Sequence, residues 1–426
     1  MRRIDYQELM RSSPDGSGED IPASVARIVR DVRTRGDEAV CEYARLLDGC
    51  RSREFRVPAE SIRRAERDVD EELRGAMRKA RENLERFARA QMQGCRSFEV
   101  EIEPGVVTGQ RVIPLRRVGV YVPGGRYPLV SSLLMGAVPA RVAGVEEIVV
   151  CSPPRRDGSL PPALLAAAGL AGVEEVYALG GAQAVAAMAY GTRTLPAVDK
   201  IVGPGNRFVT AAKRLVYGKV GIEFPAGPTE ILIIADRSAD PGLVAADLLA
   251  QAEHDVDARC GLIAMGPGII DNVDRELRRL LDGEPEDGPV RASVERGGWS
   301  TMVDSKEQAV ILANHMAPEH LELMVEDPAP FLDGLRHYGS LFVGPWSAEV
   351  LGDYSSGLNH VLPTGGAARY TGGLGVRDFL KFQTVLTVDR EGFRRIGPPA
   401  RILARTEGLS RHALAVTARE KAAGRA

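Results

Sequence analysis

The sequence predicts an α/β protein with two doubly wound, incomplete Rossmann-like domains, a helical N-terminal region and a C-terminal tail. Three observations support this prediction. From about residue 110 onwards, short apolar runs alternate with helical stretches, which is the pattern of βαβ units in a parallel sheet. The first hundred residues show apolar spacing typical of helices. With 426 residues, the chain is also long enough for two or three domains.

The N-terminal region is expected to be mainly helical. The segment 59–92 is rich in Glu, Arg and Ala and contains no proline, which favours one or two long helices. Residues 12–18 combine Ser, Pro, Asp and Gly and are expected to form a loop. Between these segments, apolar residues recur at helical spacing, at Val25, Ile28, Val29 and Val32 and at Val40, Tyr43, Ala44 and Leu47.

The remaining chain divides into strand-rich segments and a tail. Apolar runs predict strands at residues 118–122, 145–150, 173–178, 198–202, 231–235 and 261–265. Helices are expected between the last two strands and around residues 161–170 and 182–190. We therefore expect one α/β domain from residues 1–114 with 236–377, a second from 115–235, and a tail region at 378–426. The tail is expected to contain a strand at 385–388 and a final helix from about Thr406.

Composition argues against several classes of protein. The net charge of −3 gives no electrostatic reason to expect a nucleic-acid or membrane partner. The chain contains no apolar run of about 18 residues, and its first five residues lack the apolar core of a signal peptide. The five cysteines are scattered without a CxxC pair, which favours reduced thiols and a cytoplasmic location.

A first candidate site lies on the helix expected after residue 240. Asp240 can cap this helix, and Pro241 fits its first position. Gln251 and His254 then stand one turn apart, so both can reach one ion. With Asp247 they can equally form an ordinary solvated polar face, and this alternative stays open.

A second candidate is the adjacent pair Glu319 and His320. Pro318 can open a helix, which would place the pair in its first turn. Glu and His are the residue types that proton transfer near neutral pH requires. A simple role in capping the helix explains the pair as well.

Two further segments carry polar residues. The segment 352–364 contains two glycines and Pro363, so it reads as a loop, and Asp353, Asn359 and His360 suggest a ligand or metal site there. Glu407 and His412 lie on the expected terminal helix. The alternative for the segment 352–364 is a purely structural turn. The alternative for Glu407 and His412 is an ordinary surface helix.

Glycine-rich turns form a third class of candidate. Residues 180–184 and 203–207 each follow an expected strand and precede an expected helix, where backbone N–H groups can meet a phosphate. Residues 122–125 also follow a strand. None of these segments is a GxGxxG fingerprint, so tight βα turns explain them equally well.

Taken in order, these segments resemble the histidinol dehydrogenase family over about residues 20–420. The matching motifs are YVPGG at 121–125, GGAQA at 180–184, GPGN at 203–206, GPTE at 227–230, DLLAQAEHD at 247–255, APEHLE at 317–322, GDYSSGLNHVLPT at 352–364 and EGLSRH at 407–412. The resemblance implies a zinc- and NAD-dependent enzyme that oxidises L-histidinol through L-histidinal to L-histidine, the last steps of histidine biosynthesis.

The resemblance also implies a metal site. One Zn²⁺ per subunit would be bound by Gln251, His254, Asp353 and His412, a set of nitrogen and oxygen donors that suits zinc. In the family the tail ligand comes from the second subunit of a homodimer. Glu407 and His412 would then complete the neighbouring subunit's site.

Roles in catalysis and binding follow from the same resemblance. His320 is the expected general base, Glu319 is expected to activate water, and the zinc is expected to orient the substrate. Expected substrate contacts are Thr229, Gln251, His254, His320, Asp353, His360, Glu407 and His412. Expected NAD contacts, in the domain at 115–235, are Tyr121, Gln183 and Asn206. His315 and His337 have no family role and are expected to be structural.

Two other hypotheses compete with this reading. A related zinc dehydrogenase acting on a sulfonated diol would need added basic residues, and Arg369 and Lys381 lie near the motif at 352–364. An inactive metal-binding scaffold on the same fold is the second, and the intact ligand set argues against it.

Overall fold

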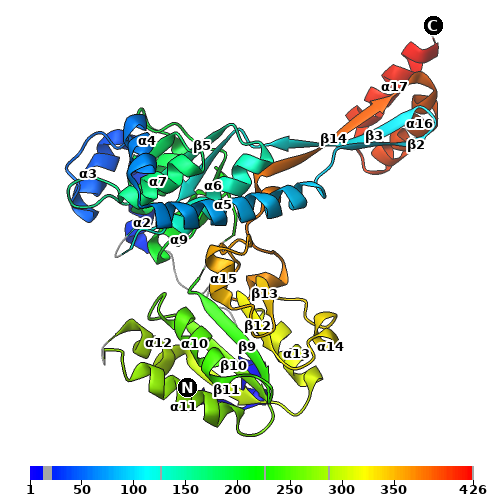
Figure 1. Cartoon of the computed structure of the whole chain (residues 1–426). Coiled ribbons are helices and arrows are strands. Elements are labelled where there is room, and N and C mark those ends of the chain that lie inside the picture. The colour runs from blue at the N-terminus through cyan, green and yellow to red at the C-terminus, as the bar shows by residue number, and fades with distance from the viewer. Residues whose placement is uncertain (13–21, 125–126, 225–226, 286–287, 425–426) are drawn as a thin grey trace. The chain divides into compact units, whose positions relative to one another are not determined.

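A computed structural model of the chain describes residues 1–12, 22–124, 127–224, 227–285 and 288–424. It confirms a mixed α/β protein with two parallel sheets (Figure 1). The chain forms two compact units, one of residues 1–89 and 115–379 and one of residues 90–114 and 380–426. Most of the predicted loop at 12–18 lies outside the described residues. Within the described part of the chain, no helix is long and apolar enough to cross a membrane.

One sheet of the larger unit has five parallel strands in the order β6-β5-β4-β7-β8. The strands are β4 (Arg117–Tyr121), β5 (Glu147–Ser152), β6 (Glu175–Ala178), β7 (Lys200–Val202) and β8 (Gly221–Ile222). The helices that connect them are α6 (Val130–Ala143), α7 (Pro162–Leu170), α8 (Gly181–Tyr190) and α9 (Arg207–Val216). The strand order reverses between β4 and β7, so this sheet is doubly wound as expected.

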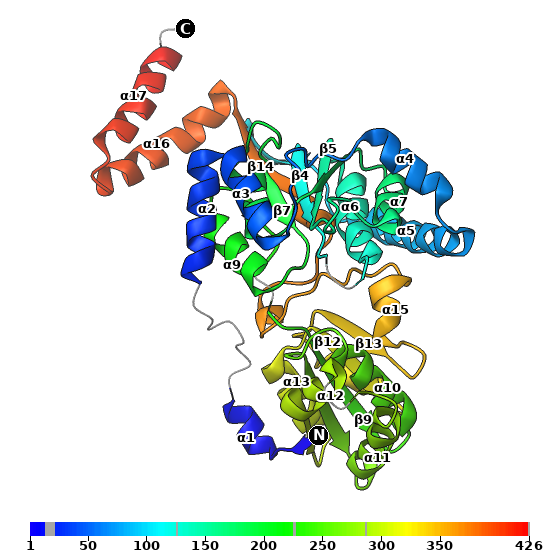
Figure 2. The same ribbon diagram turned by 90° about the vertical axis from the view of Figure 1, so that its left-hand side faces the viewer.

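The N-terminal helices pack on the helices α7, α8 and α9 of this five-stranded sheet (Figure 2). They are α2 (Ala23–Arg35), α3 (Asp37–Leu47), α4 (Ala59–Asp68) and α5 (Glu71–Met92). The apolar face of α2, with Val29 and Val32, shares a core with Val185 of α8, and α4 packs on α7. The structure therefore groups residues 23–89 with the sheet at 115–222, whereas the sequence suggested that they accompany the other sheet. The sequence predicted which faces of these helices are apolar, but it did not predict which elements pack against those faces.

The second sheet of the larger unit has six parallel strands in the order β1-β11-β10-β9-β12-β13. The strands are β1 (Arg2–Arg3), β9 (Glu230–Asp236), β10 (Arg259–Met265), β11 (Gly298–Met302), β12 (His320–Met324) and β13 (Ser340–Val343). One core contains residues of α10 (Pro241–Ala252), α11 (Ile269–Leu281) and α12 (Pro289–Gly297). A second core contains residues of α1 (Tyr6–Arg11), α13 (Lys306–Met316) and α14 (Ala329–Leu332).

The segment after Pro318 forms a strand, so the predicted helix start there is wrong. Helix α13 ends at Met316, and Ala317 takes a left-handed conformation with φ of 48°. The chain then enters β12 at His320, between β9 and β13. All five residues of β12 are buried, because the strand lies inside the sheet with helices over both faces.

The smaller unit is built from two distant parts of the chain. Strands β2 (Phe98–Glu103), β3 (Val106–Pro114) and β14 (Leu380–Val388) form an antiparallel sheet in the order β14-β3-β2. Helices α16 (Arg390–Thr406) and α17 (Ser410–Gly424) pack against each other. The predicted strand at 385–388 is confirmed as part of β14, and the predicted final helix corresponds to α17.

Candidate active site

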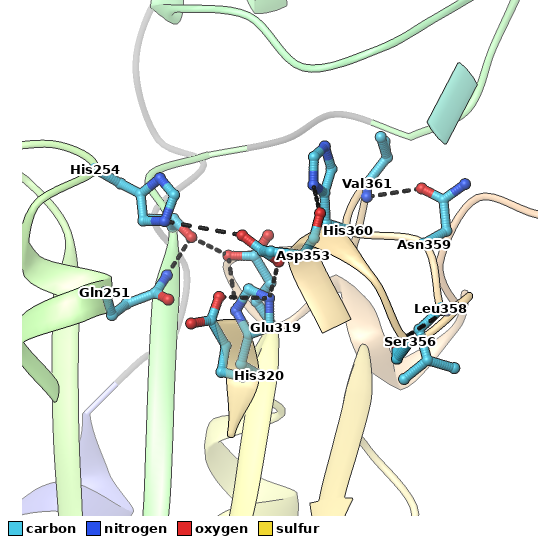
Figure 3. Close-up of polar contacts among 12 residues, drawn as sticks. Gln251, His254, Glu319, His320, Asp353, Ser356, Leu358, Asn359, His360 and Val361 are labelled. Carbon is cyan, nitrogen blue, oxygen red and sulfur yellow. Dashed lines mark hydrogen bonds and ion pairs between the residues drawn. The ribbon is translucent and has the colours of Figure 1, made fainter. Parts of the chain in front are cut away.

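A cluster of acidic, amide and imidazole side chains lies at the amino ends of β9 and β12 (Figure 3). Thr229 directly precedes β9, and Glu319 and His320 stand where β12 begins. Gln251 comes from the last turn of α10, and Asp353 from α15 (Glu349–Tyr354). The structure thus brings together five of the residues predicted for the site from four separate segments of the chain.

Gln251 and His254 occupy the end of α10 in different ways. The helix begins as predicted, with the Asp240 side chain accepting a hydrogen bond from the N–H of Gly242, but it ends at Ala252. His254 therefore lies in the turn beyond the helix and not on its face, although its N–H still donates to the Gln251 carbonyl at 3.3 Å. Gln251 is fully buried, whereas the His254 side chain is 43% exposed with Nε2 3.9 Å from Asp353 Oδ2.

A chain of hydrogen bonds fixes the orientation of the Gln251 amide. Its Nε2 donates to the hydroxyl of Thr229, which donates in turn to Glu319 Oε2 at 2.5 Å. The backbone N–H of Glu230 also donates to Glu319 Oε2 at 3.0 Å. Since the amide nitrogen is occupied, the Gln251 Oε1 atom is left as a free acceptor facing the cluster.

His320 is buried with one ring nitrogen occupied and the other free. Its Nδ1 lies 3.2 Å from the carbonyl oxygen of Glu230, which makes Nδ1 the donor and leaves Nε2 as the acceptor in the neutral ring. Nε2 lies 3.6 Å from Glu349 Oε1 and 3.7 Å from Asp353 Oδ1. Burial lowers the pKa of His320, but the carboxylates of Glu319, Asp353 and Glu349 outweigh it and raise the pKa to about 10.

Glu349 is a member of the cluster that the sequence did not point out. Its side chain is buried, and burial together with the nearby Asp353 carboxylate raises its pKa to about 8. Ligand atoms of His254, Glu349 and Asp353 all lie within 4.8 Å of one another, close enough to hold one metal ion. The available signal was the spacing, because Glu349 and Asp353 are four residues apart and share one face of α15.

Two further buried carboxylates, those of Glu230 and Glu322, accept hydrogen bonds from backbone N–H groups beside the cluster. Glu230 Oε1 accepts a hydrogen bond from the N–H of Gly365 at 2.9 Å, and burial plus the charge of Glu319 raises the Glu230 pKa to about 7. Glu322, in β12, accepts from the N–H of Glu349 at 2.8 Å and thereby anchors the start of α15. Asp247, which the sequence left as part of a possible solvated face, interacts instead with the buried Glu322 carboxyl group.

Four buried atoms of the cluster have no hydrogen-bond partner in the described structure. They are Gln251 Oε1, His320 Nε2, Glu349 Oε1 and Asp353 Oδ1. Buried polar groups are nearly always paired, so four unpaired ones beside each other indicate that a polar ligand or a cation belongs there. Amide oxygen, carboxylate oxygen and imidazole nitrogen together form a donor set that suits Zn²⁺.

His360 lies next to this cluster. Its Nδ1 is 3.1 Å from the Asp353 carbonyl oxygen, and its Nε2 is 3.3 Å from the hydroxyl of Ser132 in α6. Burial lowers the pKa of His360, so the ring is neutral at pH 7. His315, for which no site role was expected, instead contacts the carbonyl oxygen of Ser12 at 2.9 Å.

The residues expected to contact NAD lie in the five-stranded sheet. Tyr121 ends β4, and its hydroxyl accepts a hydrogen bond from the N–H of Gly181 at 3.0 Å. Asn206 follows β7 and caps α9 through its side-chain oxygen. The strand order reverses between β4 and β7, and doubly wound sheets bind ligands at the carboxyl ends of strands at that point. Gln183 is fully buried and donates to Asp48 at 3.0 Å.

The two expected tail residues belong to the smaller unit. Glu407 directly follows α16, and His412 lies in the first turn of α17. Both side chains are exposed. Gln251, His254 and Asp353 all belong to the larger unit.

Comparison with known proteins identifies the family. Residues 11–420 match the family model described as histidinol dehydrogenase. The histidinol dehydrogenase of Thermus thermophilus is 50% identical over 91% of this chain and 92% of its own length. The chain belongs to the histidinol dehydrogenase family. Another histidinol dehydrogenase, from Methanosarcina mazei, is 44% identical over 98% of this chain and 96% of its own length.

A solved structure of a histidinol dehydrogenase has the same fold. The crystal structure of the enzyme from Elizabethkingia anophelis superposes with a TM-score of 0.92 at 35% identity, covering 99% of this chain and 98% of that one. The family resemblance read from the motifs is thus confirmed, and the cluster around His320 lies in the fold of an oxidoreductase family.

Proposed function

We propose that this protein is a zinc-dependent histidinol dehydrogenase that oxidises L-histidinol through L-histidinal to L-histidine with two NAD⁺. The observation that carries the proposal is the group of four unpaired buried atoms beside Glu319 and His320, in a chain that belongs to this family. The five cysteines are free thiols, which suits the reducing cytoplasm.

The metal would be held by three residues of one subunit and by a tail residue of its partner. Gln251, His254 and Asp353 offer an amide oxygen, a ring nitrogen and a carboxylate oxygen, and the His254 side chain reaches Asp353 within 3.9 Å. His412 of the partner subunit would supply a further nitrogen, since the tail histidine is exposed and lies in the smaller unit. When bound, Zn²⁺ supplies a Lewis acid that can hold the imidazole and amine of the substrate.

His320 is the proposed general base. Because its Nδ1–H faces the Glu230 carbonyl oxygen, Nε2 is the atom that can accept the proton of the substrate hydroxyl. Its high pKa arises from three nearby carboxylates, and a cation bound at Asp353 would offset their charge and favour the neutral ring. The alcohol carbon then loses hydride to NAD⁺ as the oxygen loses its proton, which gives the aldehyde.

Glu319 is the proposed base for the second oxidation. It is buried, and burial raises its pKa, which makes its carboxylate a stronger base toward water. Water attacking the aldehyde loses a proton to Glu319, and the hydrated carbon then gives a second hydride to NAD⁺. The hydrogen bonds from Thr229 and from the Glu230 N–H hold this carboxylate in position.

Substrate and cofactor contacts follow the same assignment. Thr229, His360 and Glu407 of the partner subunit are proposed to contact L-histidinol. NAD⁺ is proposed to bind at the carboxyl ends of β4 and β7, beside Tyr121 and Asn206, where the strand order reverses. Gln183 would contribute from the turn that opens α8, although its side chain is buried here.

The test is the number of NADH molecules formed from each L-histidinol. We expect two, with activity abolished by a chelator and restored by Zn²⁺. The His320→Ala variant is the matched control, because it should keep its zinc but lose turnover. If folded, zinc-loaded wild-type protein forms no NADH from L-histidinol, the substrate assignment is wrong, and another alcohol must be sought.

A further inference from the structure

A buried ion pair lies behind the glycine turn at residues 203–206. Lys213, in α9, pairs with Glu223, which follows β8. The two side chains are 4% and 1% exposed, so the pair is almost completely removed from water. It lies at the carboxyl edge of the five-stranded sheet, on the β7 side of the point where the strand order reverses.

The pair holds the first residue of the turn from both sides. The N–H of Gly203 donates to Glu223 Oε1 at 3.0 Å, and Lys213 Nζ donates to the Gly203 carbonyl oxygen at 3.0 Å. Gly203 has a φ of 113°, and a Cβ atom there would lie 2.1 Å from the carbonyl oxygen of Tyr121. Gly203 is therefore held close against the end of β4, in a conformation that a residue with a side chain could not adopt without strain.

Stability alone does not explain a buried ion pair. Removing two charges from water costs about as much as, or more than, their mutual attraction returns, and apolar replacements of similar size are often neutral or stabilising. Within the described residues, the backbone hydrogen bonds of Glu223 Oε1 and Lys213 Nζ both go to Gly203, the first residue of the turn. The ion pair therefore fixes the conformation of the turn at Gly203.

We propose that Lys213 and Glu223 are positioning residues that shape the 203–206 turn for binding NAD⁺. The inference rests on the proposed function, which places the dinucleotide beside Tyr121 and Asn206. The turn leads into α9, whose first N–H groups are ordered by the Asn206 cap. Misplacing a binding loop by about 1 Å can cost a factor of about 100 in an enzyme, so small changes in this turn matter.

The test compares NAD⁺ binding to zinc-loaded dimers by titration calorimetry. The double variant Lys213→Met with Glu223→Met removes both charges together, so neither is left buried and unpaired. We expect its Kd for NAD⁺ to rise about tenfold or more, equivalent to about 1.4 kcal/mol. Zinc content and the melting temperature should stay near the wild-type values, because the metal ligands belong to the other sheet.

Two further variants separate positioning from general damage. The double variant Lys213→Met with Glu223→Gln also removes both charges but keeps an oxygen that can accept from the Gly203 N–H, so it should lose clearly less affinity for NAD⁺ than the double-methionine variant. The control is Arg117→Met with Glu175→Met, which removes a partly buried ion pair at the amino ends of β4 and β6, where Glu147 also loses Arg117 but keeps Arg116 as its partner. The control should leave the Kd for NAD⁺ unchanged.

Several outcomes would overturn the inference. They are an unchanged Kd in the double-methionine variant, an equal loss in the Arg117 and Glu175 control, or a loss in Lys213→Met with Glu223→Gln as large as that of the double-methionine variant. If the double variant does not fold, Gly203→Ala alters the same turn directly, and an unchanged Kd there overturns the inference. Failure of the proposed function is distinct, because wild-type protein would then bind no NAD⁺ or would be insensitive to Asn206→Ala.

Discussion

At the scale of single residues, Thr229 joins the proposed metal site to the proposed water-activating base. Its hydroxyl accepts from Gln251 and donates to Glu319. One oxygen thus fixes both the amide that should face the metal and the carboxylate that should face water. Such supporting hydrogen bonds set the orientation of metal ligands as firmly as the ligands' own geometry does.

The first prediction concerns this hydroxyl. Thr229→Val keeps the shape of the side chain but removes both hydrogen bonds, so the Gln251 amide can turn its nitrogen toward the metal. We expect the affinity for zinc to fall about 10- to 100-fold, measured by competition with a chelator. Thr229→Ser retains the hydroxyl and serves as the control. Equal zinc affinities for the valine variant and the wild type would contradict this account.

The second prediction separates the two oxidation steps. Glu319→Gln removes the carboxylate that should activate water, while His320 stays in place to accept the alcohol proton. Oxidation of L-histidinal should slow about 100-fold or more, and the first hydride transfer should slow much less. Single-turnover NADH formation from each substrate measures both steps. Equal effects on both would remove Glu319 from the role of water-activating base.

The third prediction concerns pH and Glu230. Its pKa is about 7 in the folded chain and 4.5 when exposed, because burial and Glu319 disfavour its charge. The folded state therefore binds more protons between these values, so this residue makes stability fall as pH rises from about 4.5 to 7. Glu230→Gln should gain about 1–3 kcal/mol of unfolding free energy at pH 8 and little at pH 4.

Denaturant titrations of metal-free protein at the two pH values measure this difference. The amide can still accept from the Gly365 N–H, so the substitution changes the charge and keeps the contact. A variant that is less stable than wild type at pH 8 would contradict the predicted sign.

At the scale of elements, the local pattern predicted four of the five strands of the sheet at 117–222 but only β9 and β10 of the six-stranded sheet. It also predicted helices α7, α8 and α10, including the Asp240 cap of α10. It misassigned β12, because the Pro318 signal for a helix start competed with a short strand containing a glutamate. Inside the sheet, Glu322 Oε1 accepts from the Glu349 N–H, and the Glu322 carboxyl group also interacts with the Asp247 side chain. Both partners come from other elements of the fold, so the local sequence around Glu322 cannot predict them.

The same limit applies to pairings across long distances in the chain. Strand β14 pairs with β3, so Val388 lies opposite Val106. Local periodicity carries no information about a partner almost three hundred positions away. Helix α16 was missed because Pro398 and Pro399 lie inside it, and proline there normally argues against a helix. For the site, the motifs identified Gln251, Glu319 and His320, but Glu349 needed the tertiary structure.

At the scale of the whole molecule, the residues predicted for the site come from both compact units of the chain. The larger unit contains Gln251, His254, Asp353, Glu319 and His320, while the smaller unit carries Glu407 and His412 on exposed positions. The smaller unit also exposes Leu386, Ile402 and Leu403, which are large apolar side chains of the kind that subunit interfaces cover. A homodimer in which each tail completes the partner's site would account for both features.

The fourth prediction tests that exchange directly. His320→Ala and His412→Ala should each be inactive alone, the second through loss of zinc. When the two are unfolded together and refolded as a mixture, a mixed dimer regains one intact site only if His412 acts on the partner subunit. Random assembly makes about half of the dimers mixed, so activity should return to about a quarter of the wild-type value. If His412 served its own subunit, no combination would restore a site, and the mixture would stay inactive.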